Sequence, residues 1–302
     1  MSEHIISHKT VLLEESIQAL DIKPGGVYVD ATLGGGGHTK ELLSRFPDIT
    51  VIGLDWDKSV IETTGQALQA EFPDRFFCTW GNFARIDQLV KKVGFTKVDG
   101  ILADFGTSQI QIGTTPGLSI FKDSFLDMRM STSHFKTTAC DILKEASEKE
   151  LSHIFWEFGE EPAARKIARA IVQHRAKGPI VTTHQLAKIV ETVIPYHKGK
   201  RIHPATKVFQ ALRIVVNKEL ENIRSFLHNA VHILNADGRI ACISFHSLED
   251  RSVKQFFKEQ SMPGGCLEII TQKVLVAGQE ELSKNRSSRS AKLRVAKKKE
   301  LC

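Results

Sequence analysis

Short apolar runs alternate with stretches of helical spacing along the first hundred residues of the chain. Each run has the length of a buried β-strand and ends in polar or turn-forming residues. This alternation is typical of an α/β protein with a mostly parallel sheet. Predicted strands span 27–30, 50–55, 76–80, 98–104 and 239–245, and a further strand is predicted within 267–276.

Between the fourth and fifth predicted strands the pattern changes to helices alone, through residues 138–200. Within it, residues 164–172 place Ala164, Ile167 and Ile171 on one helix face and basic side chains on another. A single crossover of a parallel sheet does not absorb this length, so we expect an inserted helical domain. The expected bounds are 110–205 for the insertion and 1–109 with 206–302 for the discontinuous sheet domain.

Composition places few limits on function. The 302 residues include 41% hydrophobic and 25% charged residues, the balance of an ordinary folded protein. No apolar run approaches the roughly 20 residues that span a bilayer. The first ten residues, MSEHIISHKT, also lack the pattern of a signal peptide. We therefore expect a cytoplasmic protein with no membrane partner.

The cysteines and histidines show no metal-binding pattern. The five cysteines are scattered without a C-x-x-C pair, and none of the twelve histidines falls in an H-E-x-x-H motif. Free thiols and no metal site are the expectation.

Positive charge is concentrated near the C-terminus. The formal net charge is +6, and residues 284–299 contain eight basic residues and no acid. Leu293 and Val295 alternate with basic residues, which predicts a strand there. Two interpretations stay open, a solvated segment and a surface that contacts RNA phosphates.

A glycine-rich loop follows the first predicted strand. Residues 30–38 read DATLGGGGH and precede a helix, a place where glycine backbone can approach a ligand closely. Asp55 ends the second predicted strand and is placed to accept hydrogen bonds from ribose hydroxyls. This arrangement suits NAD and S-adenosylmethionine (SAM) alike. The loop differs from G-x-G-x-x-G, and a second nucleotide-binding half is missing, which favours SAM.

The chain resembles one known family at several motifs. The motifs lie at 8–15, 30–38, 98–106, 126–130, 203–206, 209–213, 244–251 and 289–295. Together they resemble the bacterial 16S ribosomal RNA (cytosine-N4)-methyltransferase family, also called RsmH or MraW.

The resemblance implies a class I SAM-dependent methyltransferase, Rossmann-like with an inserted helical domain. It further implies N4-methylation of a cytidine in the decoding centre of 16S rRNA, within the small ribosomal subunit. The implied SAM contacts are Gly36, Gly37, His38, Asp55, Phe83, Asp104 and Gln111. The sequence departs from the family pattern at 104–111, which reads DFGTSQIQ, and at 116–120, which reads PGLSI.

Two residues are candidates for catalysis, Asp104 and His246. The N4 lone pair of cytosine is delocalised, so the enzyme must position the amine in line with the methyl group, a contribution of about 7–11 kcal/mol. Asp104, at the end of a central strand, is expected to bind the SAM amino group, orient the target amine, or do both. His246 is either a site residue or a structural histidine. Ser247 is expected to cap the next helix, with Asp250 reaching back.

Some candidate residues carry two interpretations. Phe83 either seats the adenine or packs in the core. Asp127 and Arg129 either contact substrate or pair with each other. The full set of candidate RNA contacts is Asp127, Arg129, Arg165, Arg169, Lys297, Lys298 and Lys299.

Alternative functions are a SAM enzyme for DNA or a small molecule, and a noncatalytic ribosome-binding SAM sensor. The oligomeric state stays open, with a homo-oligomer compatible. A paired target base would have to be flipped out of its stack.

Overall fold

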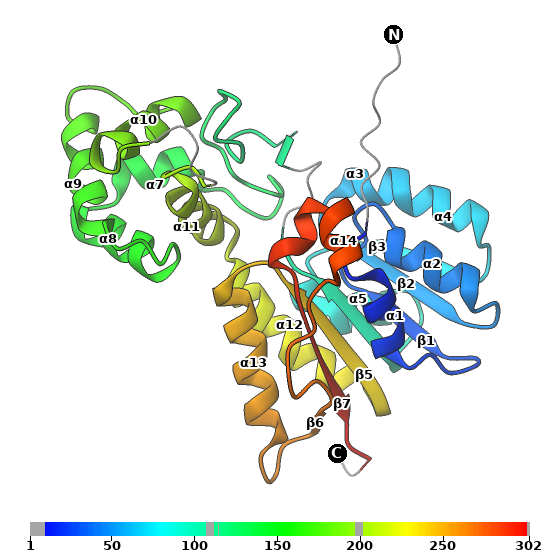
Figure 1. The fold of residues 1–302 in the computed structure, drawn as a ribbon. Helices are drawn as coiled ribbons and strands as arrows, with labels where there is room; N and C mark the ends of the chain where they lie inside the picture. Colours follow the sequence, from blue (N-terminus) through cyan, green and yellow to red (C-terminus); the bar gives the residue numbers. More distant parts are fainter. Residues whose placement is uncertain (1–9, 107–111, 114, 197–201, 301–302) are drawn as a thin grey trace. The chain divides into compact units, whose positions relative to one another are not determined.

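The computed structural model describes residues 10–106, 112–113, 115–196 and 202–300. The chain divides into two units (Figure 1). One unit contains the chain up to Gly106 and from Leu220 onward, and the other contains Thr107–Glu219.

Seven strands of the first unit form one sheet in the order β3-β2-β1-β4-β5-β7-β6. Strands β3 to β5 pair in parallel, and β7 pairs antiparallel with both β5 and β6. The strand order reverses between β1 and β4, a place where open α/β sheets bind ligands beyond the carboxyl ends of the strands. The sheet is therefore mostly parallel, as the alternation of apolar runs and helical stretches predicts. The strands are β1 (Val27–Asp30), β2 (Thr50–Asp55), β3 (Phe76–Trp80), β4 (Val98–Asp104), β5 (Leu234–Ser244), β6 (Leu267–Ile269) and β7 (Lys292–Lys298).

Helices cover both faces of this sheet, which is why its central strands are apolar in nearly every position. One face packs with α5, α12 and α13 around residues such as Ile101 and Phe226. The other face packs with α1, α2 and α4 around residues such as Leu102 and Leu43. The helical elements of this unit are α1 (Leu13–Leu20), α2 (Gly37–Arg45), α3 (Lys58–Val60), the π-helix η1 (Ile61–Gly65), α4 (Gln66–Glu71), the 3₁₀-helix η2 (Phe83–Arg85), α5 (Ile86–Lys92), α12 (Glu219–Ile233), α13 (Ser247–Ser261), α14 (Gln279–Lys284) and η3 (Arg286–Ser290).

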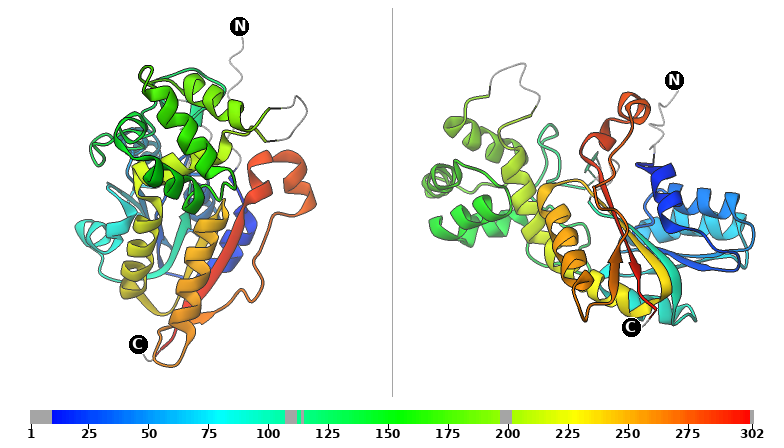
Figure 2. Two further views of the ribbon diagram at one scale, coloured as in Figure 1. Left: turned by 90° about the vertical axis from the view of Figure 1, so that its left-hand side faces the viewer. Right: turned by 60° about the horizontal axis from the view of Figure 1, so that its bottom comes forward.

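The first four strands have the predicted bounds, and the later strands differ. β5 begins at Leu234 because the expected turn at 235–239 is an irregular part of the strand. Asp237 there has a φ of 61°, and the register to β4 shifts between Val98 and Gly100. β6 is shorter than expected, and Leu275 forms only an isolated bridge to Leu293. The basic segment does form a strand, β7, which runs antiparallel beside β5 (Figure 2).

The second unit is helical, as the spacing predicts. Hydroxyl side chains begin three of its helices with reciprocal capping boxes, at Thr138, Ser147 and Thr182. Its last helix carries Phe209 and Leu212 into the same core, so the unit extends to Glu219 rather than to the expected boundary at residue 205. The helices are α7 (Ala139–Glu145), α8 (Glu148–Glu157), α9 (Ala164–Arg175), α10 (Thr183–Val193) and α11 (Thr206–Asn217).

Within the described ranges, none of the helices combines the length and the apolar character that crossing a membrane requires.

Candidate active site at the carboxyl edge of the sheet

Three neighbouring parallel strands end in aspartate. β1 ends in Asp30, β2 in Asp55 and β4 in Asp104. Asp30 is in register with Gly53 of β2 and Leu102 of β4, so the three carboxyl groups lie along one edge of the sheet. An edge built from three acids at a topological switch point favours a cationic ligand.

Asp55 is fixed by the glycine-rich loop. Its Oδ2 accepts a hydrogen bond from Gly34 N at 2.9 Å, and its Oδ1 accepts one from Asp57 N at 2.8 Å. Burial raises the pKa of Asp55 to about 6, although both backbone hydrogen bonds oppose that shift. An ionised carboxylate has about four acceptor sites, so two remain for a ligand.

Gly36 and Gly37 pack against protein. Gly36 has a φ of 75°, and an added Cβ there would lie 2.8 Å from side-chain atoms of Leu68 and Thr64. A Cβ on Gly37 would overlap Thr10 Oγ1. Close internal packing is therefore one reason for glycine at both positions, and the predicted approach of the backbone to a ligand stays a prediction. His38 is likewise buried, with Nε2 3.1 Å from Val11 O.

Of the three aspartates at this edge, Asp104 is the one with a side-chain oxygen that no described residue pairs with. Its backbone N donates to Thr32 Oγ1 at 2.7 Å, which holds the strand end against the glycine-rich loop. Its Oδ1 is buried and has no hydrogen-bond partner among the residues that the structure describes. Burial raises the pKa of Asp104 well above its usual range, and the nearby acids Asp30 and Glu249 raise it further. A buried acceptor without a partner costs about 1–3 kcal/mol, which a bound donor would recover.

Asp30 ends the neighbouring strand β1, and both of its carboxyl oxygens accept hydrogen bonds from the protein. Its Oδ2 accepts from Thr39 Oγ1 at 2.8 Å and its Oδ1 from Thr32 N at 3.2 Å. Burial raises its pKa, while the neighbouring His38 lowers it.

The position of Phe83 is compatible with both predicted roles, core packing and contact with adenine. It packs against core rings, with centroids 5.8 Å from Phe105 and 5.6 Å from Phe226. It also lies 5.9 Å from the ring of Trp56, which directly follows Asp55, and stays half-buried. Its position beside the end of β2 is therefore compatible with an adenine contact as well as with core packing.

His246 begins helix α13. Its ring accepts from Glu249 N at 3.4 Å, and Glu249 Oε2 accepts from the backbone N of His246 at 3.2 Å and of Phe245 at 2.8 Å. The cap is therefore His246 with Glu249, one residue earlier than the expected Ser247 with Asp250. Asp250 instead pairs with Arg294 at 2.6 Å.

Asp127 and Arg129 pair with each other. Arg129 donates to both carboxylate oxygens, from Nε at 2.6 Å and from Nη2 at 2.9 Å. Arg129 Nη1 also donates to Phe135 O at 3.3 Å. The internal ion pair expected as the alternative is the one that the structure forms, because both side chains are mostly buried in the helical unit.

The C-terminal lysines are placed far from the acidic edge. Register pairs Ser244 with Lys292 and Arg239 with Lys297, so Lys297 lies near the amino ends of the parallel strands. Five residues of strand separate the two edges, about 17 Å. Lys298 is buried and donates to Val231 O and Leu234 O, both at 2.9 Å.

The neighbours of Lys298 have internal partners as well. Lys297 pairs with Asp237 at 3.0 Å, and Lys299 donates to Gly265 O at 2.8 Å. The expected contact of these three lysines with RNA is thus wrong for Lys298. The structure gives the other two internal partners.

Of the remaining candidates, Arg165 and Arg169 are exposed on α9. Gln111 lies outside the described residues.

Comparison with known proteins identifies the family. The model of the MraW methylase family matches residues 5–299. A ribosomal RNA small subunit methyltransferase H from Carboxydothermus hydrogenoformans is 45% identical over 97% of this chain and 98% of its own. One from Syntrophotalea carbinolica is 42% identical over 99% of this chain and all of its own length. The chain belongs to the MraW methylase family.

As an MraW methylase, the protein is a methyltransferase with SAM as its methyl donor. A solved putative methyltransferase from Streptococcus mutans, in complex with SAH, is similar with a TM-score of 0.47 and 10% identity, over 96% of this chain and 99% of that one.

Sequence reasoning about this MraW methylase missed two residues of the site. Thr32, in the glycine-rich loop, accepts a hydrogen bond from the backbone of Asp104 at the end of β4. Glu249 accepts a hydrogen bond from the backbone of His246, and its charge raises the pKa of Asp104. The spacing of Glu249 after His246 is that of a capping box. Because such boxes ordinarily begin with serine or threonine, the sequence pattern predicted Ser247 as the cap instead of His246.

Cys242 is fully buried in this MraW methylase. Burial raises the pKa of its thiol well above the usual value, so it is poorly suited to act as a nucleophile.

Proposed function

We propose that this MraW methylase transfers the methyl group of SAM to the N4 amine of a cytidine in the decoding centre of 16S rRNA. The names of the curated relatives support ribosomal RNA of the small subunit as the substrate class. The resemblance of the sequence motifs supports the N4 amine of cytidine as the methyl acceptor and the decoding centre as its location. The reaction then takes place in the cytoplasm on a small-subunit particle.

The single observation that carries the proposal is the unpartnered carboxylate oxygen of Asp104. It lies at the end of a central strand, and the negative charges of Asp30 and Glu249 act on it. SAM carries a sulfonium and an ammonium group, so its cations suit this edge, whereas the pyrophosphate of NAD would be repelled. Bound SAM supplies an electrophilic methyl group.

The residues of the edge then take separate roles. Asp55 accepts hydrogen bonds from the ribose hydroxyls through its two remaining acceptor sites. Loop 34–38 and Phe83 lie beside the nucleoside, with Gly36, Gly37 and His38 holding the shape of the loop. Gln111 completes the proposed set.

Asp104 accepts a hydrogen bond from an amine, either that of SAM or the target N4. In the second case the carboxylate orients the lone pair of N4 toward the methyl group and stabilises the positive charge that develops on nitrogen. His246 stays a secondary candidate, since its ring already contributes to the cap of α13.

The test is methyl transfer to small subunits that lack the modification, read by nucleoside mass spectrometry as N4-methylcytidine. Asp104→Asn keeps the shape but replaces an acceptor with a group that also donates. We expect turnover to fall by about 100-fold or more, the scale of removing one preorganised polar group. Asp48→Asn, on an exposed loop before β2, is the matched control with normal product.

Measuring SAM affinity separately from turnover distinguishes the two possible roles of Asp104, binding the SAM amino group and orienting the target N4 amine. Turnover lost at saturating SAM assigns the carboxylate to the target amine, and lost affinity alone assigns it to SAM. Near-normal product from Asp104→Asn at ordinary SAM concentration would contradict both. A product methylated on carbon 5 would refute the amine chemistry, because that reaction requires a cysteine nucleophile.

A further inference from the structure

One side of helix α8 is polar and aromatic instead of apolar. Lys149, His153 and Trp156 follow at positions i, i+4 and i+7, so they lie along one stripe of the helix. The opposite side carries Leu151 and Phe155, which are fully buried in the core of the helical unit. Anchored by that core, α8 presents the stripe on the surface.

Trp156 is unusual on this stripe. It is 59% exposed, although an indole is among the side chains that most favour burial. Its exposed indole offers a flat apolar face on which a planar ligand group can stack.

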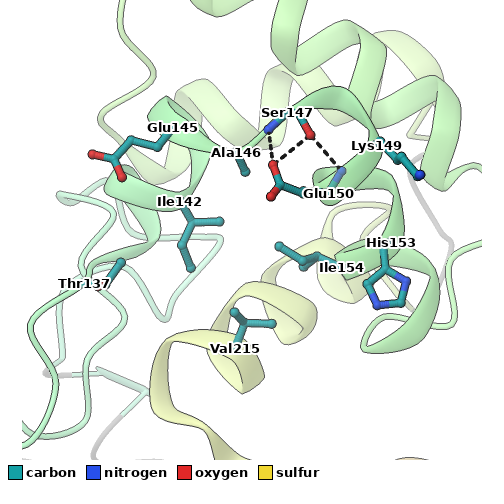
Figure 3. A pocket seen from close by; sticks show the side chains of 10 residues that line it. All are labelled: Thr137, Ile142, Glu145, Ala146, Ser147, Lys149, Glu150, His153, Ile154 and Val215. Atoms are coloured by element: carbon teal, nitrogen blue, oxygen red, sulfur yellow. Dashed lines mark hydrogen bonds between the residues drawn. The ribbon is translucent and has the colours of Figure 1, made fainter.

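Helix α9 forms the other wall of a groove that contains Trp156. The groove has a volume of about 1040 Å³ and is lined on this side by Arg165, Lys166 and Arg169. A second pocket of about 810 Å³ adjoins it and shares Lys149 and His153, which Figure 3 shows projecting from α8.

The groove carries an excess of positive charge. Four of its lining residues are cationic, and Glu148 is the acid among them. Glu148 pairs with Arg169 at 3.4 Å, but both side chains are more than two-fifths exposed, so the pairing is weak and leaves the arginine available. The groove thus offers a flat apolar ring beside a row of cations.

We propose that this groove binds a single-stranded segment of RNA, with an unpaired base stacked on Trp156 and phosphates beside Arg165 and Arg169. Stacking on aromatic side chains together with cationic contacts to the backbone is the common means of holding single strands. The inference rests on the proposed function for the identity of the RNA. An apolar protein partner would leave the four cations unmatched, which disfavours that occupant.

The experiment measures binding of a fluorescein-labelled adenine-rich RNA oligonucleotide to the full chain, at several salt concentrations. Trp156→Ala should weaken binding by roughly 5- to 150-fold, the range for loss of one stacked base. Trp156→Phe should restore most of the affinity. Replacing Arg165 and Arg169 with Gln should lower the slope of log affinity against log salt by about 0.7 for each phosphate that the protein no longer neutralises.

Matched controls define the specificity. Lys188→Gln, exposed on α10 and outside both pockets, should leave affinity and slope unchanged. A duplex of the same sequence should bind more weakly than the single strand and should not respond to Trp156→Ala.

Affinity of Trp156→Ala within twofold of the wild type, with SAM binding intact, would overturn the inference. A change in oligomeric state on Trp156→Ala, with RNA affinity unaltered, would overturn it in favour of an interface between copies. Methyl transfer by the wild type is measured in parallel. If transfer is absent while RNA binding still depends on Trp156, the proposed function fails and the groove assignment stands.

Discussion

The pH dependence of SAM binding tests the role of Asp55. Burial raises the pKa of this carboxyl group to about 6. It is therefore about nine-tenths ionised at pH 7 and about nine-tenths protonated at pH 5. A protonated carboxyl has fewer acceptor sites for ribose hydroxyls, so binding requires loss of the proton. The contribution of Asp55 to SAM affinity should fall about tenfold for each pH unit below 6.

Comparison with Asp55→Ala gives the magnitude. A hydrogen bond to a charged group contributes about 1.5–3 kcal/mol, so at pH 8 the variant should bind SAM about 10- to 150-fold more weakly. At pH 5 only about a tenth of the wild-type Asp55 carboxyl groups are ionised. The ratio of wild-type to variant affinity should therefore be about tenfold smaller at pH 5 than at pH 8. Because Asp30 and Asp104 titrate in both proteins, the ratio reports on Asp55. Isothermal titration calorimetry at pH 5, 6, 7 and 8 measures it.

Asp48→Ala is the control, since Asp48 is exposed and lies before β2, at the opposite edge of the sheet. Its affinity should equal that of the wild type at every pH. An affinity ratio between wild type and Asp55→Ala that stays constant from pH 5 to pH 8 would refute the reasoning. Either Asp55 would then make no contact with SAM, or its carboxyl group would not be desolvated.

The same shift affects the free energy of unfolding. The folded protein binds a proton at Asp55 between pH 4 and 6, while the unfolded chain has lost it. Stability from this group is therefore fully present below about pH 4 and is lost as the pH rises through about 6. The loss amounts to about 3 kcal/mol, and it should be absent in Asp55→Ala when unfolding is followed across that range.

Three further substitutions test the assignments of internal residues. Lys298→Met should lower the free energy of unfolding by about 2–4 kcal/mol in denaturant titrations, because two buried carbonyl groups lose their charged donor; Lys254→Met on the exposed side of α13 is the control, and an equal effect of both would contradict the burial of Lys298. Gly37→Ala should cost about 1–3 kcal/mol through overlap with Thr10, whereas Gly35→Ala, with open space around its Cβ position, should be tolerated; equal tolerance of both would show that packing is not the reason for glycine. Cys242→Ala should lose about 1 kcal/mol of stability and still yield N4-methylcytidine, so loss of product in a folded variant would give the thiol a role in chemistry.

Much of the fold followed from local pattern. Strands β1, β2 and β4 are buried in nearly every position, so their apolar runs alone predicted their ends. The helices of the second unit were visible from the 3.6-residue period, as in the buried face of α9. Asp55 and Asp104 were placed at the same edge by a rule of topology, since parallel strands end on one side.

The tertiary structure decided what depends on contacts between distant residues. The sequence of a basic segment does not show whether its side chains are solvated or buried. The pairing of β7 between β5 and β6 places Lys298 where it donates to carbonyl groups at the end of α12 and the start of β5. Likewise, the sequence allowed Arg129 either a substrate contact or an ion pair with Asp127, and the folded structure forms the ion pair. Hydrogen bonds and burial arise between segments far apart in the chain. The sequence therefore supplied the chemical groups, and the fold determined which of them, such as the Oδ1 of Asp104, have no partner among the described residues.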